Sequence, residues 1–184
     1  MLPQDHASSN ILEQYYPRRD RLTAIGMGDF HELEQIYPGL KYVKGDALAM
    51  PFDDGSFDWS FSHAVIEHAG SAENQELFVS ELIRVSRKGV FLTSPSRLHP
   101  VEFHTGLPLL HYLPRKLHLS LYKRAGHGFY CTEENLNLLY PREFGLRVSE
   151  AAGRLGLGER VEIRKDYVRW LGFPSNIIYV VYLK

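Results

Sequence analysis

Hydrophobic runs and polar segments alternate along this chain and predict an α/β protein. Short apolar runs typical of buried strands cover residues 22–25, 40–43, 57–65, 90–93, 161–167 and 177–183. Segments with the apolar spacing of a helix cover residues 11–16, 30–37, 72–87 and 141–155. Strands that alternate with helices in this way are typical of a mostly parallel sheet covered by helices.

The segment 72–87 gives the strongest helical pattern. Its apolar side chains share one face, and Gly89 is expected to end the helix. The residues expected on that buried face are Phe78, Val79, Leu82 and Ile83.

The interval at about 96–140 breaks the alternation of strands and helices. It is long and interrupted by prolines, and such insertions are usually functional or mobile. Within it, residues 107–124 mix leucines and tyrosines with basic residues. This stretch could be a lid over a ligand site, or a helical excursion that packs its leucines on the domain. Docking on a lipid surface is a less favoured reading.

Composition narrows the class of protein. The 184 residues fit a single domain, 1–184, with the excursion at 96–140. A formal net charge of −1 argues against nucleic-acid binding driven by overall charge. The single cysteine, Cys131, excludes an intrachain disulfide, so a reducing cytoplasmic location is the default. No apolar run approaches the ~18–20 residues of a membrane span, and no stable membrane insertion is expected.

Polar residues that follow the predicted strands are the candidates for ligand binding, because open α/β sheets bind ligands at the carboxyl ends of their strands. Asp29 follows the first strand, Asp46 and Ala47 the second, and Ser62 and His63 end the third. Carboxylates at successive strand ends can accept hydrogen bonds from ribose hydroxyls and from an adenine amine. Equally, Asp29 could cap the next helix and Asp46 could begin a turn.

One stretch resembles a known family. The run from Tyr42 to Asp58 contains D-x-x-x-x-P-F-x-D-x-S-F-D, and Ala64–His68 continues the match. These motifs resemble a class I S-adenosylmethionine-dependent methyltransferase of the methyltransferase domain 11 type. The resemblance is close over roughly residues 8–96 and loose over the last two strands. It implies a Rossmann-like, mostly parallel sheet with an antiparallel last strand, the cofactor S-adenosyl-L-methionine, and methyl transfer to a small-molecule acceptor.

The resemblance also implies roles for individual residues. Asp46 and the amide of Ala47 would hold the adenine, and Ser62 and His63 would lie near the methionine portion and the transferred methyl group. The ribose-binding acid of the family falls nearest Gly28, so Asp29 would have to reach back. His68 would order the loop that contains it. The acceptor could be linked to a lipid or a saccharide.

The sequence lacks the first, central strand of this family and the glycine-rich turn after it. Met1–Asp5 resembles the tail of that turn. Without the strand, two sheet edges would carry unpaired backbone groups. A misplaced start or a truncated reading frame is favoured over a replacement segment or chain. We therefore expect weak cofactor binding and a possible homodimer through an exposed edge. The alternative function is a truncated or inactive methyltransferase-like binding domain.

Histidines are the candidates for proton transfer. His63 and His104 could each deprotonate a methyl acceptor, although either could be a structural residue. No metal site is expected: His104, His111 and His118 recur every seven residues, but prolines interrupt them, and no HExxH motif is present. A serine hydrolase is not expected either, because no G-x-S-x-G motif occurs.

Overall fold

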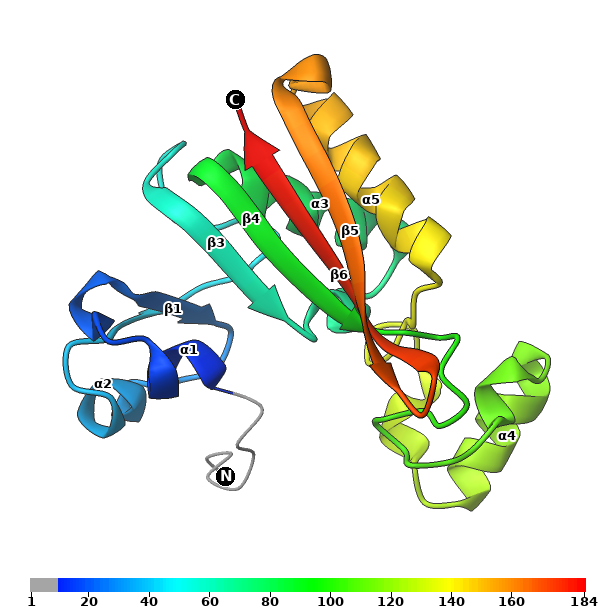
Figure 1. Cartoon of the computed structure of the whole chain (residues 1–184). Helices are drawn as coiled ribbons and strands as arrows, with labels where there is room; N and C mark the ends of the chain where they lie inside the picture. The colour runs from blue at the N-terminus through cyan, green and yellow to red at the C-terminus, as the bar shows by residue number, and fades with distance from the viewer. Residues whose placement is uncertain (1–9) are drawn as a thin grey trace. The chain divides into compact units, whose positions relative to one another are not determined.

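The computed structural model describes residues 10–184 and divides the chain into two compact units, Met1–Pro51 and Phe52–Lys184 (Figure 1). The expected tail of a glycine-rich turn at Met1–Asp5 lies outside the described residues. None of the described helices has the length and apolar character needed to cross a membrane.

The first unit contains a β-α-β arrangement. Strands β1 (Thr23–Gly26) and β2 (Lys41–Lys44) pair in parallel, and helix α2 (Glu32–Ile36) connects them. A parallel pair needs such a crossover, which is why the helix lies between the two strands in sequence. Helix α1 (Ile11–Tyr15) and the 3₁₀ helix η1 (Arg19–Arg21) precede β1.

The second unit is built on a four-stranded sheet in the order β3-β4-β6-β5. Its strands are β3 (Phe57–His63), β4 (Ser86–Pro95), β5 (Val161–Trp170) and β6 (Phe173–Leu183). β3 and β4 are parallel, whereas β6 runs antiparallel to both β4 and β5. The predicted α/β class with an antiparallel last strand is confirmed.

The core of this unit lies between the sheet and two helices, α3 (Ala72–Arg84) and α5 (Pro141–Arg154). Figure 1 shows both helices on the same face of the sheet. Every second residue of β6 from Ser175 to Val181 is buried, as the two-residue period of a strand requires. The four apolar residues expected on one face of the strongest helix are all buried.

The excursion between β4 and α5 holds the 3₁₀ helices η3 (Leu110–Tyr112) and η4 (Gly128–Cys131) and the helix α4 (Arg115–Arg124). Figure 1 shows it beyond the carboxyl end of β4. In α4 the buried residue is Tyr122, while the leucines remain partly or largely exposed. The 3₁₀ helices η2 (Ile66–His68) and η5 (Gly158–Arg160) complete the unit.

Gly89 does not end α3, which corrects the prediction. The helix stops at Arg84, and Gly89 lies inside β4, paired with Tyr182 of β6. A Cβ atom at this position would collide with the carbonyl oxygen of Val181 and with the ring of Trp59. The glycine is therefore required by the close approach of neighbouring strands.

Gly89→Ala should lower the free energy of unfolding of the second unit by about 1–3 kcal/mol, because the backbone oxygen it would meet cannot rotate away. Gly153→Ala is the matched control: it lies in α5 with open space around it, and should stabilise the helix by about 0.5–1 kcal/mol. Urea denaturation followed by tryptophan fluorescence measures both. Equal effects of the two substitutions would contradict the steric explanation.

Within the described part of the chain, β1 pairs with β2 alone and β3 with β4 alone. Each is therefore an edge strand of its sheet.

Candidate functional site

Asp29 lies in the loop after β1 and is exposed, with 74% of its side chain accessible. Its Oδ1 is 3.9 Å from His31 Nε2. His31 occupies the N-cap position of α2, and no side chain makes a capping hydrogen bond there. Asp29 therefore does not cap α2, and its carboxylate remains accessible to a ligand.

The side chain of Tyr42 holds this loop in place. Its buried hydroxyl lies 2.9 Å from the carbonyl oxygen of Gly26 and 2.6 Å from that of Gly28, so it donates a hydrogen bond to the chain that leaves β1. The amide of Tyr42 donates to Glu34 Oε1 at 2.8 Å. Tyr42 thereby links β2, α2 and the loop that carries Asp29, a role that the sequence pattern did not reveal.

Asp46 and Ala47 follow β2 in a turn. One carboxylate oxygen of Asp46 accepts a hydrogen bond from the amide of Leu48 at 2.9 Å. This hydrogen bond belongs to the turn that the sequence predicts at Asp46. It does not compete with ligand binding, because Asp46 is exposed and a carboxylate has further acceptor sites.

Ser62 and His63 end β3 in the second unit. Ser62 is buried, and its hydroxyl has no hydrogen-bond partner among the described residues. His63 Nδ1 lies 2.7 Å from the hydroxyl of Thr93 on β4, and partial burial lowers the pKa of the imidazole. Ala64 follows with φ of 53°, a strained conformation for a residue with a side chain. β3 therefore ends at His63, and the imidazole of this residue is neutral and oriented by Thr93.

His104 is held by a buried carboxylate. Glu102 Oε1 accepts from His104 Nδ1 at 2.7 Å and from the His104 amide at 2.9 Å, and Glu102 Oε2 accepts from the amide and hydroxyl of Thr105. Burial would raise the pKa of Glu102, but these hydrogen bonds outweigh it and lower the pKa to about 2. Glu102 is therefore ionised and fixes the orientation of the His104 ring.

Two further side chains face the same ring. His104 Nε2 lies 3.1 Å from His68 Nε2 and 3.8 Å from Oε1 of the fully buried Glu67. His68 Nδ1 contacts the carbonyl oxygen of Asn135 at 2.6 Å. Burial raises the pKa of Glu67 to about 7 and lowers the pKa of His68. His68 does order its loop, as expected, but it also faces His104.

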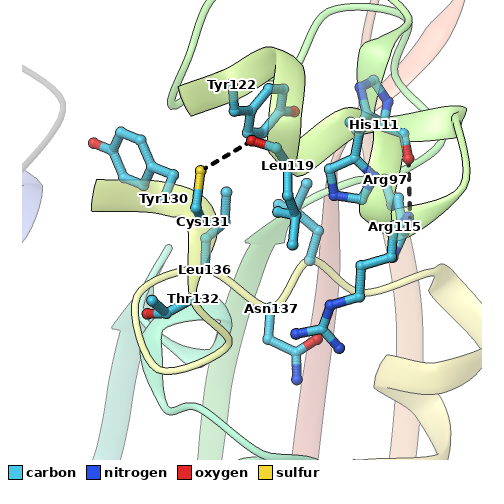
Figure 2. Close-up of a pocket in the computed structure, with 12 residues that line it drawn as sticks. Arg97, His111, Arg115, Leu119, Tyr122, Tyr130, Cys131, Thr132, Leu136 and Asn137 are labelled. Atoms are coloured by element: carbon cyan, nitrogen blue, oxygen red, sulfur yellow. Dashed lines mark hydrogen bonds between the residues drawn. The ribbon is translucent and has the colours of Figure 1, made fainter. Parts of the chain in front are cut away.

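A pocket opens within the excursion (Figure 2). All of its lining residues fall between 97 and 138, inside the excursion predicted at 96–140. Arg97 Nη2 donates to the carbonyl oxygen of His111 at 3.2 Å, while Arg97 Nε and His111 Nδ1 are buried without a partner in the described part of the chain. The walls come from α4, η4 and the segment after it, and include Arg115, Tyr122, Tyr130 and Asn137.

The predicted residues are thus distributed over both units. The first unit carries Asp29, Asp46 and Ala47, and the second carries Ser62, His63 and His104. His63 contacts Thr93, whereas His104 faces Glu67, His68 and Glu102.

Comparisons with known proteins indicate which family this chain resembles. Residues 26–93 match the family described as "Methyltransferase domain". Ajmaline N-methyltransferase of Rauvolfia serpentina is 40% identical over 55 residues, which are 30% of this chain and 18% of that protein. The chain therefore spans a minor part of that relative's length.

Solved structures share the fold at low sequence identity. A SAM-dependent methyltransferase of Methanosarcina mazei superposes with a TM-score of 0.54 at 15% identity, over 88% of this chain and 81% of the other. Magnesium protoporphyrin IX methyltransferase of Synechocystis, solved with bound SAH, gives 0.52 at 11% identity, over 88% and 64%. Residues 26–93 are therefore similar to the methyltransferase domain family, and the described chain shares the fold of solved S-adenosylmethionine-dependent methyltransferases.

Proposed function

We propose that this protein transfers a methyl group from S-adenosyl-L-methionine to a small-molecule acceptor. One observation carries the proposal: within a methyltransferase-type fold, β3 ends in a buried, unpartnered Ser62 hydroxyl and an oriented His63. Buried polar groups without partners are rare, so Ser62 is suited to a ligand that supplies the missing hydrogen bond. The bound SAH of the Synechocystis relative supports the choice of cofactor.

In this proposal the first unit binds the nucleoside half of the cofactor. The exposed carboxylate of Asp46 accepts from the adenine amine, the amide of Ala47 donates to the ring, and Asp29 accepts from a ribose hydroxyl. Tyr42 is a positioning residue, because it holds the loop that carries Asp29. Ser62 and His63 are the residues that the family resemblance assigns to the methionine portion.

Methyl transfer from a sulfonium needs an aligned acceptor more than it needs acid or base chemistry, and a base serves only to remove the acceptor proton. His63 and His104 are the two proposed bases. His63 fits better: its Nδ1 is fixed by Thr93, and its lowered pKa keeps the ring neutral at pH 7. The Nε2 of His104 instead faces His68 and Glu67.

The acceptor is proposed to enter through the excursion, which then acts as a lid. Its pocket contains the guanidinium groups of Arg97 and Arg115, which suit an acceptor that carries a negatively charged group. A cytoplasmic location is also proposed, on the ground that Cys131 is the single cysteine of the sequence.

Nuclear magnetic resonance provides the test, because it detects weak binding. Titration of S-adenosylhomocysteine into the isotope-labelled chain should give saturable shifts of the amides near Asp46 and Ala47 and near Ser62 and His63. Adenosine should shift the first group and leave the second unchanged. No saturable shift at either group would overturn the proposal, and binding without transfer to any acceptor would favour an inactive binding domain.

Asp46→Ala should weaken S-adenosylhomocysteine binding by about 1–3 kcal/mol, the cost of losing a hydrogen bond to a polar ligand. Asp29→Ala is the matched comparison and should have a smaller effect, because its position is displaced by one residue from that of the family's ribose-binding acid. Dissociation constants from the same titration measure both. Unchanged affinity in Asp46→Ala would remove this residue from the site.

A further inference from the structure

Two histidines and a buried glutamate converge beside the carboxyl end of β4. One ligand atom each from Glu67, His68 and His104 can be chosen so that all three lie within 4.8 Å of one another. His104 comes from the excursion, and the other two come from η2, so the tertiary structure brings together residues far apart in the sequence. The side of the cluster at His68 is exposed, which leaves a path for a ligand from solvent.

The hydrogen bonds of the two imidazole rings determine which nitrogens carry protons. His68 Nδ1 faces the carbonyl oxygen of Asn135, and His104 Nδ1 faces the carboxylate of Glu102. Both partners accept hydrogen bonds and cannot donate them, so both Nδ1 atoms are protonated. The two Nε2 atoms then face each other across 3.1 Å. A metal cation placed beside both nitrogens would be coordinated by their lone pairs.

Glu67 adds a carboxyl oxygen at the same place. Its Oε2 accepts a hydrogen bond from the hydroxyl of Ser94 at 3.0 Å, but its Oε1 has no partner among the residues described. The side chain is completely buried, and Oε1 is 3.8 Å from His104 Nε2, too far for a hydrogen bond. A buried carboxyl oxygen without a hydrogen-bond partner is costly, and a cation would satisfy it.

We propose that Glu67, His68 and His104 bind a divalent transition-metal cation of the Zn²⁺ type. Imidazole nitrogens with one carboxylate are a common ligand set for such ions. Ligands about 2.1 Å from a tetrahedral Zn²⁺ lie about 3.4 Å from one another, and the separations of 3.1 and 3.8 Å in this cluster bracket that value. Three protein ligands leave a fourth position for water or another small ligand.

The surroundings of the cluster support the same conclusion. Zinc-binding histidines usually donate their second ring N–H to a carboxylate or a backbone carbonyl, which orients the ring. Glu102 provides the carboxylate for His104, and Asn135 provides the carbonyl for His68. The sequence analysis expected no metal because it compared His104 with its neighbours in sequence, His111 and His118, which are not in the cluster.

This cation site does not depend on the proposed methyl transfer, and its test does not measure catalysis. With the cation bound, His104 Nε2 is a ligand and is not available as a base. His63 then remains as the base of the proposed reaction.

Zn²⁺ titration of the chelator-treated full chain, in competition with a chromophoric chelator, tests the proposal. The wild-type chain should bind a single tight equivalent. His68→Gln, His104→Gln and Glu67→Gln should each raise the dissociation constant by about 100-fold or more, because each removes a ligand. His127→Gln is the matched control, since its side chain is outside the cluster, and it should bind like wild type. Circular dichroism confirms that each variant is folded.

Co²⁺ provides a second readout, since tetrahedral coordination by nitrogen and oxygen gives visible absorption far stronger than that of the hydrated ion. Glu102→Gln should weaken binding by about 10-fold while keeping the absorption, as expected of a positioning residue. Zn²⁺ affinity that is the same in wild type and in the His68→Gln, His104→Gln double variant would overturn the proposal. Failure to bind S-adenosylhomocysteine would leave it unaffected.

Discussion

Replacement of His63 by Gln should slow methyl transfer by about 10²–10⁴-fold, the usual contribution of a general base. The imidazole ends β3 and contacts the hydroxyl of Thr93 through Nδ1. In the tautomer that donates from Nδ1 to Thr93, Nε2 is free to accept the proton of an acceptor. Glutamine preserves a polar side chain of similar length but cannot take up that proton. Transfer of a labelled methyl group from S-adenosylmethionine to a panel of small hydroxyl and amine compounds measures the effect.

The pH dependence gives this prediction a second readout. Burial lowers the pKa of His63, so the neutral, proton-accepting form predominates at pH 7. In wild type, kcat/KM should fall as the pH decreases through this lowered pKa, below the ordinary histidine value of about 6.5. The fall should be absent in His63→Gln. His127→Gln should retain wild-type rates, and an equal loss in that control would show that the effect is not specific to His63.

Phe144→Ala should destabilise the second unit by about 3–5 kcal/mol. Phe144 lies on α5, is completely buried, and packs edge-on against Tyr179 of β6 with ring centroids 4.8 Å apart. Its truncation leaves a cavity between the helix and the sheet. Both tryptophans of the chain, Trp59 and Trp170, belong to strands of this unit, so urea denaturation followed by their fluorescence reports on its unfolding.

Leu146→Ala is the matched control on the same helix. Leu146 is 46% exposed, and its truncation should cost less than about 1 kcal/mol. The difference between the two variants isolates the contribution of the core from that of the helix. If both substitutions had the same small effect, α5 would not be packed on the sheet as the structure describes.

The family motif could be recognised from the sequence, but the structure explains several of its residues through packing and ion pairs. Arg84 at the end of α3 forms ion pairs with Glu81 at 2.7 Å and with Asp54 at 2.8 Å, and also donates to the carbonyl oxygen of Phe52. Asp58 lies between Arg87 and Lys88. Much of the motif therefore stabilises the turn before β3. These contacts explain the presence of Phe52, Asp54 and Asp58 without a ligand.

The elements themselves were predictable where a local pattern repeats. The predicted segments correspond to α1, α2, α3 and α5 and to all six strands, with ends displaced by a few residues. The largest difference is at Gly89, where a glycine after a helical pattern normally indicates a helix end. Gly89 is required because Val181 and Trp59 approach it closely, and these two residues belong to strands that lie far away in the sequence.

Sequence alone determined the alternation of strands and helices, the family motif and the residues that end β1, β2 and β3, because hydrophobic period and strand ends are local properties. Only the tertiary structure decided how Tyr42 supports the loop after β1, how Glu102 orients His104, and how Glu67 and His68 meet His104. These contacts join residues separated by up to 37 positions, such as Glu67 and His104. Their chemistry depends on burial and on hydrogen-bond direction, which the folded chain creates.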